Sequence, residues 1–164
     1  MFNVKKGKKK RIILICAGGG HFNEIMQLEE MFVKYDYLLI TERTPLMSAF
    51  KDSYNICFLK PRPMGKKRRL LFFVSVVINF YQSIKLLFKH YPKVIITTGG
   101  PTAAPMCFLG KLLGVKIVFI LSYARINSKA LTADIVYPVV DKFIIQWQDV
   151  KHYYAKGIFL GGIY

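Results

Sequence analysis

A glycine turn followed at once by a histidine is the first place in this sequence where chemistry could occur. Gly18, Gly19 and Gly20 precede His21, directly after a short apolar run. Glycines permit positive φ angles and let backbone N–H groups approach a phosphate at the positive end of a following helix. A histidine there could remove a proton from an attacking hydroxyl. Two alternatives stay open: a turn that merely needs glycine, and a histidine that bonds to backbone.

A second glycine turn of the same kind follows a later apolar run. It consists of Thr98, Gly99, Gly100, Pro101 and Thr102. Pro101 suits the first position of a helix, where its missing N–H needs no partner. Turns that leave parallel strands at their carboxyl ends lie on one edge of the sheet and flank the crevice where such folds bind ligands. We therefore expect both turns, with Asn23 beyond the first, to contact one phosphate-bearing ligand.

The first turn does not match the dinucleotide-binding fingerprint. Reading G-x-G-x-x-G from Gly18 puts Asn23 where the third glycine belongs. Glu42 nevertheless stands near the end of the second predicted strand, where such a fold would hold a ribose. A protein that binds a whole nucleotide by itself therefore stays open as an alternative.

These turns need a scaffold of alternating strands and helices. Apolar runs predict strands at 12–16, 37–41, 56–59, 94–98, 115–121 and 142–146. Helical spacing predicts helices at 21–33, 45–51 and 70–89, one ending at 113, and one at about 128–137. Glu24 lies off the apolar stripe of the first helix. The alternation predicts an α/β fold: a Rossmann-like parallel sheet with helices on both faces, formed by residues 12–164 after a basic arm at 1–11.

The chain is both strongly basic and unusually apolar. It carries 25 Lys and Arg against 9 Asp and Glu, a net charge of +16, and 53% of its residues are hydrophobic. Such an excess of positive charge favours phosphate-bearing partners, either nucleic acid or anionic lipid. Nucleic acid is disfavoured, because neither basic block interleaves aromatic residues on a strand platform.

One basic cluster leads directly into an apolar helix and predicts an anionic membrane surface as a partner. The residues concerned are Lys66, Lys67, Arg68, Arg69, Leu70, Leu71, Phe72 and Phe73. The apolar stretch is shorter than the roughly 20 residues that span a bilayer. A helix that lies in the membrane interface and is held by the cluster fits this pattern. A buried core helix with a solvated basic cap is the alternative.

Metal and cofactor sites are not predicted. Cys16, Cys57 and Cys107 lie far apart in apolar runs, without a CxxC pair or a histidine at ligand spacing. Reduced structural thiols are expected at all three positions. The N-terminus lacks the pattern of a signal peptide, which predicts a cytoplasmic location.

Several motifs in a fixed order resemble a known family. They are Gly19-Gly20-His21, Thr98-Gly99-Gly100-Pro101, Ser122-Tyr123-Ala124-Arg125, Tyr137-Pro138 and Gln146-Trp147. In this order they resemble the Alg-fourteen type of oligosaccharide biosynthesis protein, over Lys10 to Tyr164. Among bacterial members, the chain is similar in length to the PssD or CpsF type subunits of capsule and exopolysaccharide clusters.

The resemblance implies half of a split enzyme. This chain would be equivalent to the N-terminal domain of a MurG-like GT-B glycosyltransferase, inactive alone, and a small donor-binding subunit of the PssE or CpsG type would complete the cleft. A UDP-sugar would be transferred with inversion to a polyprenyl-diphosphate-linked sugar at the cytoplasmic face of the membrane. His21 would be the base, and Ser122 and Arg125 would join the glycine turns around the acceptor. Gln146, Trp147 and Tyr164 would contact the partner.

One departure from the family pattern concerns an acidic residue. The family carries one just before the Ser-aromatic-x-Arg stretch, where this chain has Leu121. A further alternative from another class is a scaffold that only anchors and activates a catalytic partner.

Overall fold

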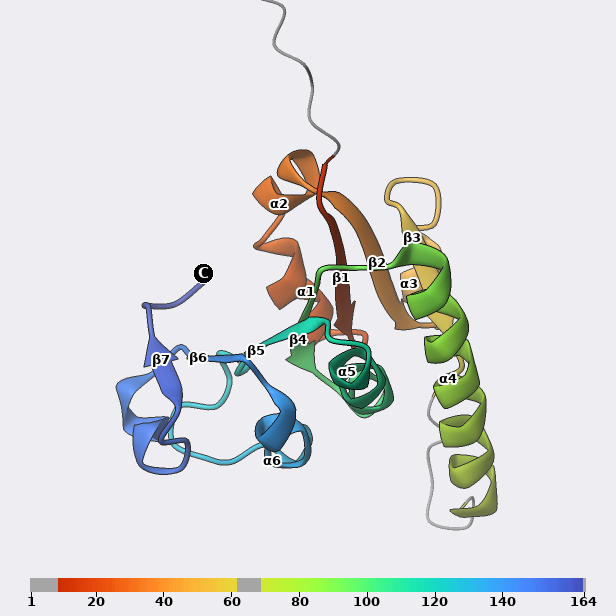
Figure 1. Ribbon diagram of the computed structural model, residues 1–164. Helices are drawn as coiled ribbons and strands as arrows, with labels where there is room; N and C mark the ends of the chain where they lie inside the picture. The colour runs from red at the N-terminus through yellow and green to blue at the C-terminus, as the bar shows by residue number, and fades with distance from the viewer. Residues whose placement is uncertain (1–8, 62–68, 164) are drawn as a thin grey trace, which may run out of the picture.

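The computed structural model describes residues 9–61 and 69–163 of the chain and shows seven parallel strands in one sheet (Figure 1). The strand order is β3-β2-β1-β4-β5-β6-β7. The strands are β1 (Arg11–Cys16), β2 (Asp36–Glu42), β3 (Ile56–Leu59), β4 (Val94–Gly99), β5 (Lys116–Ile120), β6 (Lys142–Ile145) and β7 (Gly157–Phe159). The chain builds outward from β1 to β3, then returns to β4 and builds outward the other way. The direction in which successive strands are added thus reverses between β1 and β4. Folds of this kind bind ligands in the crevice between the two strands where the direction reverses.

Helices cover both faces of the sheet. They are α1 (Gly20–Met26), α2 (Glu30–Lys34), α3 (Pro45–Ser48), α4 (Arg69–His90), α5 (Ala103–Leu112) and α6 (Leu131–Val136), with 3-10 turns at Tyr137–Val139 and Gln148–His152. Figure 1 shows α4 along one side of the molecule and α5 next to it, away from α1 and α2.

Alternate residues of β1 face the two helical layers. Ile13 and Ile15 belong to the core that includes α4, α5 and α6, whereas Leu14 and Cys16 belong to the core that includes α1 and α3. Because side chains alternate across a strand, a strand buried on both faces must be apolar throughout. The predicted Rossmann-like α/β fold is confirmed.

The first helix differs from the prediction. A single helix was expected at 21–33, but a turn separates α1 from α2. In this turn, the N–H groups of Leu28 and Glu29 donate to carbonyl groups three residues earlier. The break lets Phe32 stack on Tyr37 at a ring-centroid distance of 4.5 Å, while Phe22 stays buried under α1. Tertiary packing here outweighs a local helical pattern.

Two further differences lie near the turns and at the sheet edge. Pro101 is not the first residue of a helix, because it precedes Thr102, the N-cap of α5. The edge strand β7 was not predicted; it has only three residues, and Ile158 and Phe159 are exposed. Its first residue, Gly157, has no room for a side chain, since a Cβ would lie 2.8 Å from the carbonyl oxygen of Tyr154.

Candidate functional site

The two glycine turns meet at the carboxyl edge of the sheet. The N–H of Ala17 donates to the carbonyl of Gly99 over 3.2 Å. Gly99 and Gly100 have φ angles of +111° and +104°, and a Cβ on Gly100 would lie 2.5 Å from the Cβ of Ala17. Backbones packed this closely at positive φ require glycine. The structure therefore brings together the two turns that the sequence singled out.

A bulge in β4 ties His21 to the second turn. The register between β1 and β4 shifts after Ile15, so that Cys16 pairs with Gly99 and Thr98 is the extra residue. Thr98 is buried, and its hydroxyl donates to the backbone carbonyl of His21 over 2.9 Å. Bulges beside functional sites often redirect a side chain in this way.

The ring of His21 lies over Gly99. A Cβ on Gly99 would be 3.5 Å from Cε1 of the imidazole and 3.9 Å from Nδ1. The side chain is 33% exposed, but its Nδ1 is buried and lies 3.4 Å from Oε2 of Glu24, one helical turn later. Because Nδ1 faces Glu24, the other ring nitrogen, Nε2, is the one that can meet a ligand.

Glu24 is buried at 3% exposure and joins α1 to the loop after β5. Its Oε1 accepts hydrogen bonds from the hydroxyl of Ser122 at 2.6 Å and from the N–H of Tyr123 at 2.8 Å. Burial alone would raise the pKa of Glu24, but the contacts with His21, Ser122 and Tyr123 outweigh it and hold the pKa below its usual value. Glu24 is thus a carboxylate at neutral pH.

Glu24 is the site residue that the sequence did not reveal, since a polar residue off the apolar stripe is expected in solvent. Leu121, where this chain departs from the family pattern, is buried in the core, and the two residues after it, Ser122 and Tyr123, bond to the carboxylate of Glu24. The signal that could have found Glu24 is its spacing from His21, because residues three apart share one side of a helix.

The other residues that were predicted to bind the acceptor differ in their burial and in their contacts. Thr102 is buried, and its hydroxyl has no hydrogen-bond partner among the described residues. Asn23 and Pro101 are exposed. Arg125 is exposed as well, and its guanidinium lies 3.5 Å from the hydroxyl of Ser128. Neither Asn23 nor Arg125 is held in place as His21 is.

Two of the residues predicted to contact the partner, Gln146 and Trp147, bond to the loop that follows β5, and Gln146 also bonds to Ile163. Gln146 is 3% exposed: its Nε2 donates to the carbonyl of Leu121, and its Oε1 accepts from the N–H of Ile163, both over 2.9 Å. Its side chain therefore faces inward. The indole of Trp147 donates to the carbonyl of Tyr123 over 2.7 Å. Tyr164 lies outside the described residues.

Helix α4 buries three polar residues and exposes many apolar ones, although Leu87 near its end is buried in the core. Ser75, Asn79 and Ser83 are buried at 4% exposure or less. The amide of Asn79 bonds both the N–H and the carbonyl of Lys60, over 2.9 and 3.0 Å. Among the side chains of α4 whose burial the structure describes, the exposed large apolar ones are Leu71, Phe73, Val74, Val76, Val77, Phe80, Tyr81 and Phe88.

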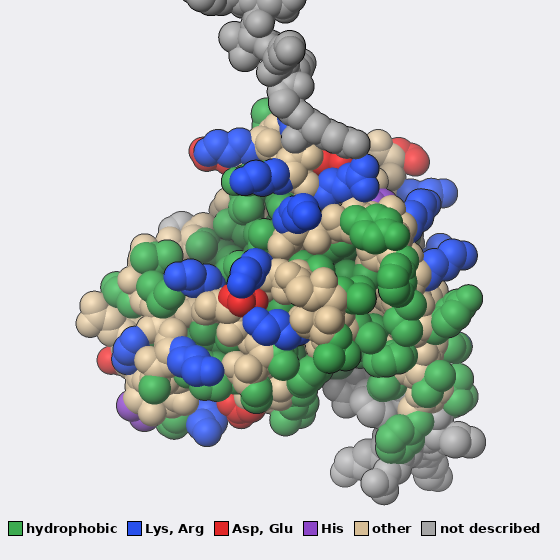
Figure 2. Space-filling model, in the orientation of Figure 1, with side chains coloured by type: hydrophobic (Ala, Val, Ile, Leu, Met, Phe, Trp, Pro, Cys, Tyr) green, Lys and Arg blue, Asp and Glu red, His purple; other side chains and the backbone are tan. Residues whose placement is uncertain are grey.

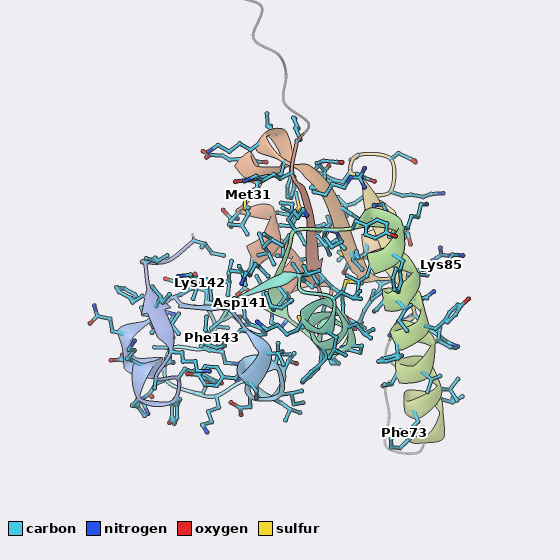
Figure 3. All side chains as sticks on the ribbon, viewed as in Figure 1. Met31, Phe73, Lys85, Asp141, Lys142 and Phe143 are labelled. Atoms are coloured by element: carbon cyan, nitrogen blue, oxygen red, sulfur yellow. The ribbon has the colours of Figure 1, made fainter. Side chains whose placement is uncertain are left out.

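Figure 2 shows hydrophobic side chains gathered along the side of the molecule occupied by α4, and Figure 3 shows Lys85 projecting from it, away from the sheet. A contiguous apolar surface of this kind marks an interaction site. The predicted Lys66, Lys67 and Arg68 lie outside the described residues; Arg69, Leu70 and Phe72 belong to α4. No helix in the described parts of the chain is long and apolar enough to cross a bilayer.

No three His, Cys, Asp or Glu side chains within residues 9–61 and 69–163 are placed to share a metal ion. Cys16 and Cys107 are buried free thiols, and burial raises the pKa of each to about 12. Cys57 is partly buried and also free. A thiol with so high a pKa is a poor nucleophile, because the thiolate is the reactive form.

The fold defines the class of protein as a Rossmann-like α/β domain. MurG from Acinetobacter baumannii superimposes with a TM-score of 0.68 at 14% sequence identity, over 83% of this chain and 41% of that one. The chain thus spans about two fifths of the solved structure that it matches. At this identity the likeness concerns the fold alone.

Sequence comparison identifies the family. A family model described as "Oligosaccharide biosynthesis protein Alg14 like" matches residues 48–163, more than half of the chain. This chain belongs to that family. The Schizosaccharomyces pombe protein named "UDP-N-acetylglucosamine transferase subunit alg14" is 27% identical over 96% of this chain and 85% of its own length. The Kluyveromyces lactis protein named "UDP-N-acetylglucosamine transferase subunit ALG14" is 33% identical over 94% of this chain and 80% of its own length.

Proposed function

We propose that this chain is the acceptor-side subunit of a heteromeric glycosyltransferase that moves a sugar from a UDP-sugar to a lipid-linked saccharide. The observation that carries the proposal is the position of His21. Its ring lies over Gly99 at the edge of the sheet where both glycine turns meet, with Nδ1 facing a buried carboxylate. A histidine so placed can act as a general base for an attacking hydroxyl.

The chemistry that fits this site is an inverting displacement. Nε2 of His21 takes the proton of a sugar hydroxyl on the acceptor while the hydroxyl oxygen bonds to the anomeric carbon of the donor. The bond from that carbon to UDP breaks, and UDP leaves with the electron pair. The backbone groups of Gly18 to Gly20 and Gly100, and the hydroxyl of Thr102, are proposed to hold the diphosphate of the acceptor. The N–H of Gly99 already donates to the hydroxyl of Thr97 over 2.9 Å.

We propose that α4 holds the protein at the cytoplasmic face of the membrane as a peripheral subunit. A helix that exposes Phe, Val and Tyr while it buries Ser and Asn gains stability from an apolar surrounding on its outer side. Lys85 and Lys89 on the same helix, with the predicted cluster at 66–69, would attract anionic lipid. The basic arm at 1–11 is proposed to add to this attraction.

The donor and the pathway are narrower proposals. The curated relatives are named for UDP-N-acetylglucosamine, so we propose this sugar nucleotide as the first donor to test. The resemblance to PssD and CpsF type subunits supports a capsule or exopolysaccharide product and a partner of the PssE or CpsG type. UDP-galactose and UDP-glucuronate are the donors to compare under that proposal.

Reconstitution tests the proposed division of labour. This chain, a candidate donor-binding subunit from a neighbouring open reading frame, and the two together are each assayed with a UDP-sugar and a polyprenyl-diphosphate-linked acceptor in vesicles. We expect transfer only with both chains and the membrane present. Transfer at nearly full rate by the partner alone to a soluble acceptor would support the scaffold alternative. Transfer by this chain alone would contradict the proposal.

A further inference from the structure

The two oxygens of Glu24 have different surroundings. Oε1 accepts two hydrogen bonds, from the hydroxyl of Ser122 and the N–H of Tyr123. Oε2 is buried, and its near neighbour is Nδ1 of His21 at 3.4 Å, an atom that is also buried without a hydrogen bond among the described residues. A buried oxygen acceptor and a buried ring nitrogen each destabilise the fold unless they form a hydrogen bond, and here they face each other.

These surroundings determine which nitrogen of His21 carries the proton. A carboxylate oxygen can only accept, so Nδ1 must be the donor if the pair is to bond. In the neutral ring, Nε2 then keeps its lone pair and points away from Glu24. The hydrogen bonds from Ser122 and Tyr123 to Oε1 fix the orientation of the Glu24 carboxylate. The carboxylate in turn fixes the orientation of the His21 ring.

We propose that Glu24 is the positioning residue of His21: it fixes the Nδ1–H tautomer and the ring orientation, so that Nε2 is ready to accept a proton from the acceptor hydroxyl. This inference rests on the proposed function for its catalytic meaning, whereas the tautomer itself is a property of this chain. Ser122 and Tyr123 act through Glu24, because they fix Oε1. The depressed pKa of Glu24 agrees with this role, since the carboxylate must stay charged to accept from the ring.

The substitution Glu24→Gln separates positioning from packing. Both neighbours of Oε1 are donors, so the amide oxygen must take that place and the NH₂ group must face Nδ1. Nδ1 then has to accept, and the proton moves to Nε2. The ring keeps its place while the base loses its lone pair, as in a catalytic triad whose carboxylate becomes an amide.

Nitrogen-15 NMR of histidine in the full-length chain reads the tautomer directly, at about pH 8, where an unperturbed imidazole is neutral. The His21 signals are assigned by their loss in His21→Ala. We expect the Nδ1–H form in the native protein and in Ser122→Ala, which keeps the carboxylate, and the Nε2–H form in Glu24→Gln. In the reconstituted enzyme, Glu24→Gln should lower kcat by about 10²- to 10⁴-fold with little change in KM.

The two readouts separate the possible failures. An Nε2–H tautomer in the native protein, which requires no variant, would overturn the assignment of Glu24. So would a Glu24→Gln protein that still shows Nδ1–H. A tautomer that switches as expected while kcat stays normal would leave the positioning intact and remove His21 from the proposed reaction.

Discussion

The outer face of α4 offers a sharp test, because a membrane surface and a core contact predict opposite effects of the same change. Phe73, Val77 and Tyr81 follow one another at four-residue spacing and form one stripe of the helix. Their exposed fractions are 55%, 67% and 68%. We consider the triple variant in which all three become serine.

The size of the effect follows from the area still exposed. Burying a large apolar side chain completely is worth about 1.5–3 kcal/mol, so the exposed fractions leave about 1–2 kcal/mol for each residue. If the stripe enters the apolar part of the interface, the variant loses about 4 kcal/mol of membrane affinity, which is about a thousandfold. In water only the buried part of each side chain, about a third to a half, contributes to stability, so by the same reckoning each change should cost about 1 kcal/mol or less.

The assay combines vesicle sedimentation with urea unfolding. A matched control replaces Val33, Leu112 and Leu131 with serine; these residues are 76%, 83% and 77% exposed and lie outside α4. We expect the α4 variant to lose vesicle binding while its free energy of unfolding falls by no more than about 1 kcal/mol per residue, and the control to keep its binding. Native binding by the α4 variant, or a loss of about 2–5 kcal/mol of stability per residue as in a core, would refute the reasoning.

Three further predictions concern the stability of the fold. Gly100→Ala should destabilise the protein by about 2–5 kcal/mol in urea unfolding, because alanine at this φ is strained and its Cβ would overlap Ala17; unchanged stability would contradict the packing of the two turns. Asn79→Ala should cost about 1–3 kcal/mol by the same measurement, since it leaves the N–H and carbonyl of Lys60 unpaired; an effect below about 0.5 kcal/mol would contradict it. Burial would raise the pKa of Asp141, but a backbone N–H and two lysines lower it to about 2, so the stability that it contributes is present above about pH 4 and is lost as pH falls towards 2. Asp141→Asn should flatten that part of a stability-versus-pH curve, and an unchanged curve would contradict the assignment.

Much of the fold could be predicted because the signals are local. The apolar runs identified six of the seven strands, and the predicted helix at 70–89 is within one residue of α4 at each end. The break between α1 and α2 could not be predicted, since it depends on Phe32 reaching Tyr37 in the folded sheet. The strand β7 could not be predicted from the sequence. It is short and lies at the edge of the sheet, and its two exposed apolar residues show no alternation of apolar and polar side chains.

The two glycine turns are the part of the candidate site that could be predicted from the sequence. Glycines between a strand and a helix indicate a turn, and the topology of a parallel sheet brings two such turns to one edge. The burial of Glu24 is different, because its partner Ser122 lies 98 residues away in the sequence. Helix α4 is a mixed case: the sequence predicted an apolar helix that faces a membrane surface, but not that Ser75, Asn79 and Ser83 would face the core.

The central claim, that this chain contributes the base of a sugar transfer, is tested most directly by the turnover of His21→Ala in the reconstituted two-chain enzyme. His152→Ala is the matched control, because His152 is exposed in the 3-10 turn at Gln148–His152. We predict that His21→Ala still assembles with its partner but loses about 10²- to 10⁴-fold in kcat, while the control keeps native turnover. Native turnover by an assembled His21→Ala enzyme would contradict the account.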